Sequence, residues 1–248
     1  FMAGVFYAQK KFGKSMQDQT VFYLGYILTG FTCLWGIATG TYFGQAWLPS
    51  TVKAVVPWLN VTENIQWLCF AVALAHLSLA RAWAAKIKFP SITFLSEIGW
   101  LMIVWGMYFL ANMFVLKKAV PPITNWLFIV GIALAFFFMF PPKEFLKKIG
   151  QEVIPFVLGI IGAGTDIVSY IRLFAVGLAT VAVADAANAM PADLPGVGYG
   201  FMIFLHLLNL VLAAMAILVH AIRLNVLEFS GHLGLEWAGF GFKPFKKK

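Results

Sequence analysis

Six long apolar runs constrain the fold of this chain more than any other feature. They cover residues 21–48, 65–85, 92–116, 124–140, 152–190 and 199–229. A bilayer admits only segments whose backbone polar groups are bonded internally, which means helices or closed barrels. These runs all reach the range of a spanning helix, about 17–25 residues, or exceed it, and are longer than barrel strands of about 10 residues. The sequence therefore predicts an all-α polytopic membrane protein with six complete transmembrane helices.

The composition agrees with this class. Hydrophobic residues make up 61% of the chain and charged residues only 11%, whereas soluble domains carry about 25% charged residues. The formal net charge is +8, but the basic residues fall in short loops between apolar runs, a pattern typical of membrane topology and not of nucleic-acid binding. Cys33 and Cys69 lie inside apolar runs and have no disulfide or metal spacing.

The length of the N-terminal apolar segment and the distribution of basic residues predict how the chain begins and how it is oriented in the membrane. Residues 1–9 are apolar but too short to span, so we interpret them as a truncated helix in a partial chain. Of the 18 lysines and arginines, thirteen fall on the side of the first loop and the C-terminus, and three on the other side. Because positive charge accumulates in cytoplasmic loops, both the first loop and the C-terminus are expected in the cytoplasm.

The last two runs are too long for upright helices. Residues 152–190 would form a helix of about 58 Å at 1.5 Å per residue, against about 30 Å of hydrocarbon. Either the helix is strongly tilted, or its ends leave the membrane, or it breaks at Gly159, Gly162 or Gly164. Geometry alone leaves these alternatives open.

Arg172 is the residue around which we organise a functional prediction. A charge at the centre of a membrane helix is unfavourable by about 2.5 kcal/mol or more, so such residues are rare and usually functional. On a helical wheel Arg172 lies on a stripe of short aliphatic side chains: Val176, Ala179, Val183 and Ala186, flanked by Ala175 and Ala187. Ordinary packing of small residues explains the stripe but not the arginine. A stripe of short side chains that contains one fixed charge favours contact with a partner protein whose surface slides past this helix.

A second arginine, Arg223, shares a helix face with other polar residues. The polar residues of that face are Asn209, His220 and, further round, His206. Interhelical hydrogen bonds are the simpler explanation of each residue taken singly. Their collection beside an arginine favours a polar path.

The predicted orientation sorts the polar side chains into two groups. Asp166, Ser169 and Glu228 fall on the cytoplasmic side of the arginines. The outer group consists of Thr180, Asp185, Asn188, His206, Asn209 and His220. This layout suits two half-channels separated by an arginine layer. Asp185 and Asn188 lie on the face of their helix opposite Arg172, so an outer path through them would run behind the stripe. Capping, or pairing with an arginine, is the alternative role for Asp166 and Asp185.

No other chemistry is indicated. The sequence has no nucleotide-binding loop, no metal-spaced histidine pair and no nucleophile elbow, so no cofactor and no metal are expected. His232 and Glu236 follow Gly231 and are predicted to lie at a solvated helix end. Two other functions remain: a self-contained secondary transporter whose arginines bind an anionic substrate, and a membrane enzyme with His206 or His220 as a base. The transporter would usually contain an inverted repeat, and none is visible.

Several motifs resemble the membrane domain of subunit a, or subunit I, of V-type and A-type rotary ATPases. The run Ser169-Tyr170-Ile171-Arg172-Leu173 resembles the family's first arginine signature, and the run from His220 to Phe229 resembles its second. Gly40-Thr41-Tyr42-Phe43-Gly44 and the terminal Lys243-Pro244-Phe245 fit as well. The form Glu228-Phe229-Ser230-Gly231-His232 is similar to the bacterial branch.

The resemblance implies a stator that is not catalytic on its own. Its last two helices would be long, strongly tilted and packed against a rotating proteolipid ring, with Arg172 separating proton or sodium half-channels. Further implied partners are peripheral-stalk and central-stalk subunits and the lipid bilayer, in a multi-pass protein of the bacterial plasma membrane. Thr180 and Ala213 stand where some members have histidine and glutamate, which leaves the outer relay open.

The resemblance also divides the chain into parts. Residues 1–9 would be the truncated helix, 10–150 a four-helix scaffold, 151–230 the ion-translocating helix pair and 231–248 a cytoplasmic tail. The family's large N-terminal cytoplasmic domain is expected to be absent from this chain.

Overall fold

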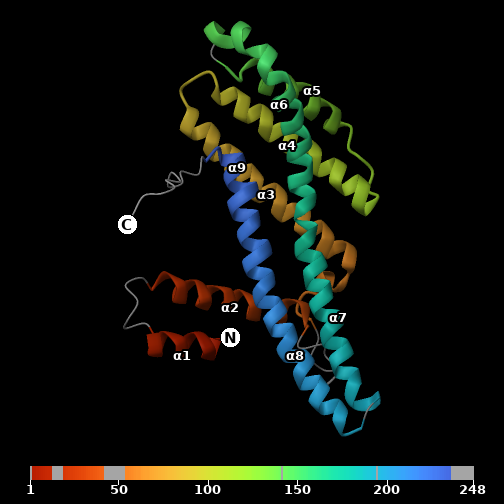
Figure 1. The fold of residues 1–248 in the computed structure, drawn as a ribbon. Helices are drawn as coiled ribbons and strands as arrows, with labels where there is room; N and C mark the ends of the chain where they lie inside the picture. Colours follow the sequence, from red (N-terminus) through yellow and green to blue (C-terminus); the bar gives the residue numbers. More distant parts are fainter. Residues whose placement is uncertain (1, 13–18, 42–53, 141, 194, 236–248) are drawn as a thin grey trace, which may run out of the picture. The chain divides into compact units, whose positions relative to one another are not determined.

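The computed structural model describes residues 2–12, 19–41, 54–140, 142–193 and 195–235, and of residues 142–149 the backbone only. Within these ranges the chain is helical and contains no strand (Figure 1). The elements are α1 (Met2–Phe12), α2 (Thr20–Thr39), η1 (Pro57–Asn60), α3 (Thr62–Lys88), α4 (Phe94–Leu116), α5 (Ile123–Phe137), α6 (Pro142–Ser169), α7 (Ile171–Asp193), α8 (Val197–Ala216), η2 (Ile217–Ala221), η3 (Leu224–Phe229) and α9 (Ser230–Leu233).

Five helical segments in the described residues are long and apolar enough to cross a membrane. They are Thr20–Thr39, Thr62–Lys88, Phe94–Leu116, Gly150–Asp193 and Val197–Leu233, and Ile123–Phe137 is apolar but shorter. The prediction of an all-helical, multi-pass membrane protein is therefore confirmed. The count of six complete spans and the strong tilt of the last two stay predictions.

The chain divides into two compact units. One unit comprises Phe1–Ile65 and Gly177–Ala213, and the other comprises Gln66–Val176 and Ala214–Lys248. We call the first the outer unit, because it contains most of the polar residues predicted on the outer side of the arginines, and the second the arginine unit, because it contains both Arg172 and Arg223.

The core of the arginine unit is formed by α3, α4, α6 and η3. Phe70 and Leu77 of α3 are fully buried together with Val104 of α4 and Ile167 of α6, and Leu224 of η3 completes the cluster. Large apolar side chains fill this core, so removing one would leave a cavity. The polar side chains described below lie along helices fixed by this packing.

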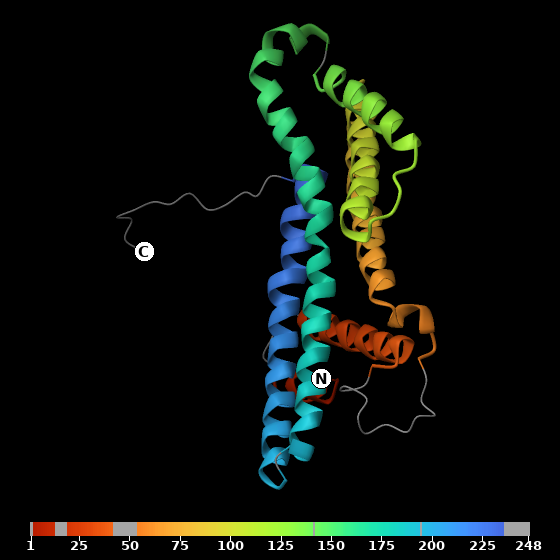
Figure 2. The ribbon, with the colours of Figure 1, turned by 90° about the vertical axis from the view of Figure 1, so that its right-hand side faces the viewer.

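A close approach of two backbones joins α4 to α5, which lie side by side in Figure 2. A Cβ atom on Gly99 would lie 2.3 Å from the backbone nitrogen of Ala135 and 2.7 Å from the carbonyl oxygen of Gly131. The Ser96 hydroxyl, one turn earlier, donates to the Ala135 carbonyl at 3.0 Å. Small residues permit such approaches between membrane helices, so position 99 requires glycine.

In the outer unit, α2 ends earlier than predicted. It stops at Thr39 because Gly40 adopts a left-handed conformation, with φ of 67°. A Cβ on Gly40 would also come within 3.0 Å of the Ala54 backbone. The predicted extension of this helix to residue 48 is therefore wrong. Residues 42–44 of the glycine-rich motif lie outside the described residues.

Several predicted loops are helical instead. Lys10 and Lys11 belong to α1, and the basic segment with Lys143, Lys147 and Lys148 belongs to the first turns of α6. The predicted loop from residue 191 to 195 is also partly wrong, since α7 continues through Pro191 to Asp193. Pro191 lies two residues before the end of α7, so the helix ends soon after the residue that removes a backbone donor. Lys14, Glu236 and the Lys243-Pro244-Phe245 motif lie outside the described residues.

The long helix through Arg172 does not break at its glycines. Gly159, Gly162 and Gly164 all lie within α6, and the interruption falls at Tyr170. There the Tyr170 N–H donates to the Ile167 carbonyl at 3.2 Å, and the Leu173 N–H donates to the Tyr170 carbonyl at 3.0 Å. Bonds that span three residues are the mark of a tightened, 3₁₀-like turn. Arg172 thus stands directly after a local change in helix geometry.

Candidate functional site

Glu228 is a buried carboxylate at the centre of a polar cluster in the arginine unit. It is 5% exposed, and its Oε1 accepts a hydrogen bond from the Ser169 hydroxyl at 3.2 Å. The Nε of Arg223 lies 3.8 Å from the same oxygen. Glu228 Oε2 is buried without a hydrogen-bond partner among the described residues. A buried acid with one unpaired oxygen is unfavourable, and it can bind an incoming proton or cation.

A change in helix type brings Arg223 and Glu228 together. They are five residues apart, which in an α-helix places side chains about 140° from each other. Residues 224–229 form a π-helix, as do residues 217–221. In a π-helix the backbone bonds run from i to i+5, so residues five apart share a face. This geometry carries the guanidinium over the carboxylate.

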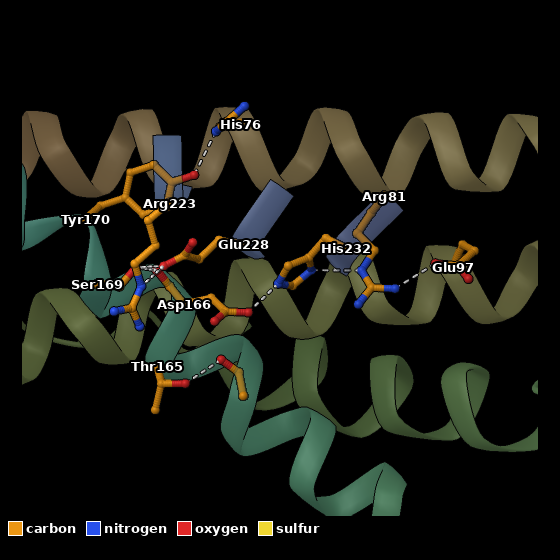
Figure 3. Close-up of polar contacts among 11 residues, drawn as sticks. His76, Arg81, Glu97, Thr165, Asp166, Ser169, Tyr170, Arg223, Glu228 and His232 are labelled. Atoms are coloured by element: carbon orange, nitrogen blue, oxygen red, sulfur yellow. Dashed lines mark hydrogen bonds and ion pairs between the residues drawn. The ribbon is translucent and has the colours of Figure 1, made fainter. Parts of the chain in front are cut away.

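His232 is buried between two charged side chains, contrary to the prediction of a solvated end. Its relative exposure is 4%. The Nε of Arg81 donates to His232 Nδ1 at 3.0 Å, and His232 Nε2 lies 2.9 Å from Asp166 Oδ2. Because Nδ1 accepts from a guanidinium, Nε2 carries the proton and donates to the carboxylate. Figure 3 shows the imidazole between its two partners.

Arg81 and Glu97 extend this row of polar groups across α3 and α4. Glu97 Oε2 lies 2.9 Å from Nη1 of Arg81, and its Oε1 lies 2.5 Å from Nζ of Lys88. The Arg81 guanidinium also stacks over the Trp100 ring, 5.0 Å from its centroid. Arg81 lies inside α3, within the predicted run 65–85, and its side chain is largely buried. Buried charges persist where they are paired.

Together these contacts form a continuous row, from Lys88 through Glu97, Arg81 and His232 to Asp166. The Ser169 hydroxyl has one proton and two acceptors within reach, the backbone carbonyl of Asp166 at 2.7 Å and Glu228 Oε1 at 3.2 Å. Asp166, Ser169, Arg223 and Glu228 therefore meet in the structure. The Asp166 carboxylate is therefore paired with a histidine, His232, and not with an arginine, the partner considered from the sequence.

Arg172 is partly buried and lacks a partner for one of its nitrogens. Its Nη1 is buried without a hydrogen-bond partner among the described residues. In the arginine unit, Ala175 of the predicted stripe is exposed, three residues after Arg172. In the outer unit, Ala179 and Ala186 of the stripe are exposed, whereas Ala187 is fully buried. An unpaired guanidinium in apolar surroundings can bind a carboxylate or another anion.

The predicted outer residues divide between the two units. In the outer unit, Asn188 Oδ1 lies 3.1 Å from His206 Nε2, and Asn209 Nδ2 donates to the Thr180 carbonyl at 2.9 Å. These contacts join residues 177–193 of α7 to residues 197–213 of α8, which lie side by side in Figures 1 and 2. Asn209 Oδ1 is buried without a partner within the described ranges.

Asp185 and His220 do not join these contacts. Asp185 is exposed on α7. His220 lies in the π-helical segment η2 of the arginine unit, and its Nδ1 is buried without a hydrogen-bond partner in the part of the chain that is described. Among the same residues there is no group of three or more side chains that could hold a metal ion. Neither residue has a structural role that its surroundings explain.

Sequence reasoning missed five residues of the arginine unit: His76, Arg81, Glu97, Tyr170 and His232. A signal existed for two of them. Glu97 stands alone in an apolar run and Arg81 precedes the end of another, and buried charges seek opposite partners. His76 is a lone histidine in mid-helix, and no local pattern indicates its bond to Tyr170. No sequence pattern indicates the π-helical segments that precede His232.

Comparison with known proteins identifies relatives over most of the chain. It is 36% identical over 241 residues to the V-type ATP synthase subunit I of Borreliella burgdorferi, covering 86% of this chain and 39% of that protein. It is 31% identical over 246 residues to V-type ATP synthase subunit I 1 of Treponema pallidum, covering 91% and 40%. The A-type ATP synthase subunit I of Pyrococcus horikoshii is 27% identical over 242 residues, covering 88% and 35%.

Neither a protein-family model nor a solved structure matches the chain. The chain spans about two fifths of the length of the bacterial relatives named above. The bacterial relatives are V-type and the archaeal relative is A-type ATP synthase subunit I, and the two bacterial matches cover 86% and 91% of this chain at 36% and 31% identity. The chain therefore belongs to the V-type and A-type ATP synthase subunit I family.

Proposed function

We propose that this chain is the ion-translocating stator part of an ATP-driven rotary complex. In this proposal it forms two half-channels against a ring of proteolipid subunits, and Arg172 separates them. The single observation that carries the proposal is the Arg172 guanidinium, which has a buried nitrogen without a partner in the described residues and stands three residues before the exposed Ala175. A moving ring carboxylate would supply the missing partner and then slide past.

Arg172 acts as an electrostatic barrier in the proposed cycle. A nearby guanidinium favours the ionised form of an arriving carboxylate, which therefore releases its proton or sodium ion into the outer path. Arginine does not lose its own proton in proteins, so the ion cannot pass from one path to the other through Arg172. The ring then carries the carboxylate past the arginine, where it is reloaded.

The inner path is assigned to Asp166, Ser169 and Glu228. Their support is the contact geometry: Ser169 bonds Glu228, and Glu228 retains an unpaired oxygen within the described residues. Arg223, 54% exposed in its side chain, has its Nε 3.8 Å from Glu228 Oε1. In this proposal Arg223 supports the barrier formed by Arg172.

The outer path is assigned to Asn188, His206 and Asn209, with Asp185 and His220 as further candidates. The first three make the interhelical contacts between α7 and α8. Asn209 Oδ1 is an available acceptor, since no described residue bonds it. Thr180 and Ala213 provide neither a histidine nor a glutamate, so amide and imidazole groups would carry the ion.

The remaining assignments belong to the same proposal. Residues 10–150 act as scaffold, 151–230 as the translocating pair and 231–248 as a cytoplasmic tail in a bacterial plasma membrane. Stalk subunits would hold the stator, and nucleotide hydrolysis would take place in other subunits. Support comes from the positive charge on one side of the membrane helices and from the names of the relatives.

Replacing Arg172 by alanine tests the proposal. We expect the intact complex carrying Arg172→Ala to lose ATP-driven ion pumping into proteoliposomes while it still assembles. Lys86→Ala, which removes an exposed cation of α3, is the matched control and should pump normally. Normal pumping by Arg172→Ala would refute the role. Transport of an anion by the purified chain alone would favour the secondary transporter, and sodium-free buffer with an uncoupler would distinguish proton from sodium.

A further inference from the structure

Tyr170 and His76 form a hydrogen bond that the proposed ion path does not use. The Tyr170 hydroxyl lies 2.7 Å from His76 Nδ1, and the tyrosine is 1% exposed. Tyr170 stands at the interruption between α6 and α7, two residues before Arg172. Figure 3 shows the phenol reaching from this interruption to His76 on α3. The bond therefore ties a fixed scaffold helix to the turn from which Arg172 projects.

His76 makes a second contact, with the helix that carries Arg223. Its ring stacks on Phe229 with the centroids 4.4 Å apart and the planes at 15°. Phe229 directly follows Glu228, and Glu228 accepts the hydrogen bond from Ser169, which directly precedes Tyr170. Starting from His76, the contacts thus pass through Phe229, Glu228, Ser169 and Tyr170 and return to His76. All five residues belong to the arginine unit.

A closed set of contacts constrains more than a single contact does. One bond between two helices still permits sliding and rotation. This circuit joins the pair 169–170 to the pair 228–229 at one point, and joins each pair to His76 of α3 at one further point. Membrane helices associate through packing and through hydrogen bonds between helices. Breaking the bond to His76 would leave the Ser169 contact as the remaining member of the circuit that holds the pair 169–170.

We propose that His76 and Tyr170 are positioning residues for Arg172, fixing the helix turn that presents its guanidinium to a passing carboxylate. This inference rests on the proposed function of Arg172 and assigns roles that the ion path itself does not require. The hydroxyl of Tyr170 holds the turn, and the imidazole of His76 connects that turn to Phe229 and so to Glu228. Without the bond, the turn would relax and Arg172 would occupy its productive position less often.

Four variants separate the hydrogen bond from the ring contacts. Tyr170→Phe removes only the hydroxyl. His76→Phe keeps a ring against Phe229 but has no acceptor, whereas His76→Asn keeps a polar atom where Nδ1 stood and loses the stack. The fourth is the double variant Tyr170→Phe with His76→Phe. Tyr23→Phe removes a hydroxyl from an exposed tyrosine of α2 and serves as the matched control.

The measurement is the number of ions pumped per ATP hydrolysed by the assembled complex in proteoliposomes. We expect Tyr170→Phe and His76→Phe each to lower this ratio about three- to tenfold, the population change that follows from losing one ordinary hydrogen bond. The double variant should be no worse than either single variant, because both remove the same bond. His76→Asn should recover a ratio within about twofold of the parent.

Two results would overturn the inference. One is a parental ratio for Tyr170→Phe, and the other is a double variant whose loss equals the product of the single losses. A purely structural role would lower the yield of complex and leave the ratio per assembled complex unchanged, which also contradicts the inference. Arg172→Ala in the same preparations keeps the two proposals apart: if it abolishes pumping while Tyr170→Phe is normal, only the positioning role fails.

Discussion

Replacing Glu97 by glutamine should destabilise the arginine unit strongly. The side chains of Arg81 and Glu97 are only 16% and 7% exposed and lie 2.9 Å apart. Removing one partner of a buried ion pair typically costs about 3–5 kcal/mol, because the other charge is left buried and uncompensated. Arg81 retains His232 and the Trp100 ring as neighbours, which places the expected loss near the lower end, about 3 kcal/mol.

Two further variants test the origin of this loss. Lys88 is 47% exposed at its side chain, so Lys88→Gln should change the free energy of unfolding by less than about 1 kcal/mol. Replacing both charges, with Arg81→Met and Glu97→Leu together, should recover more than half of the loss, since apolar residues can take the place of a buried pair. The effect is therefore expected to depend on an unpaired charge and not on volume.

Unfolding can be followed through the buried cysteine of α3. Cys69 is buried and Cys33 is exposed, so in a Cys33→Ser background a thiol-reactive dye reports the exposure of Cys69. Purified protein in detergent is heated in the presence of the dye, and the midpoint temperature is compared between variants. Glu97→Gln should unfold several degrees below its parent. A midpoint equal to the parent's, or a double variant less stable than Glu97→Gln, would refute the reasoning.

Three shorter predictions follow from other contacts. Gly99→Ala should destabilise the α4–α5 pair by about 1–3 kcal/mol through overpacking, and the dye assay should show a lower midpoint, whereas Gly162→Ala, with open space around its Cβ position, should not. Glu228→Gln should slow ATP-driven pumping at least tenfold at unchanged assembly. His232→Phe should leave Asp166 without its donor and reduce pumping, and His232→Gln should restore part of it. Normal pumping by Glu228→Gln or His232→Phe would contradict the assigned inner path.

The membrane fold was predictable because one physical rule dominates it. Apolar runs of helix length must satisfy their own backbone groups, and the positions of α3 and α4 follow from that rule to within a few residues. The ends were harder to predict. Gly40 stops α2 through its left-handed backbone, while Lys143 and Pro191 looked like loop residues and lie in helices. Local turn and capping chemistry, not hydrophobicity, decides these boundaries.

The sequence indicated some residues of the candidate site but not which side chains contact each other. Orientation placed Asp166, Ser169 and Glu228 on one side of the arginines, and the structure brings these three into contact. The burial of His232 was missed because the residue follows the last apolar run and Gly231, a position that indicates a solvated helix end, whereas the structure buries it against Arg81 and Asp166. The bond between His76 and Tyr170 joins residues 94 positions apart, and a single sequence carries no signal for such a distant pair.

The π-helical segment from Leu224 to Phe229 makes the C-terminal helix tolerant of a single deletion. Wider turns hold more residues than α-turns, so removing one residue would let the backbone return to ordinary α-helical bonding. Leu227, whose side chain is 57% exposed, could be deleted without emptying the core. Glu228 would then follow Arg223 by four residues, and residues four apart in an α-helix share a face just as residues five apart do in a π-helix. The side chains of Glu228 and His232 would therefore keep their directions around the axis, whereas a deletion from an ordinary α-helix would turn every later side chain by about 100°.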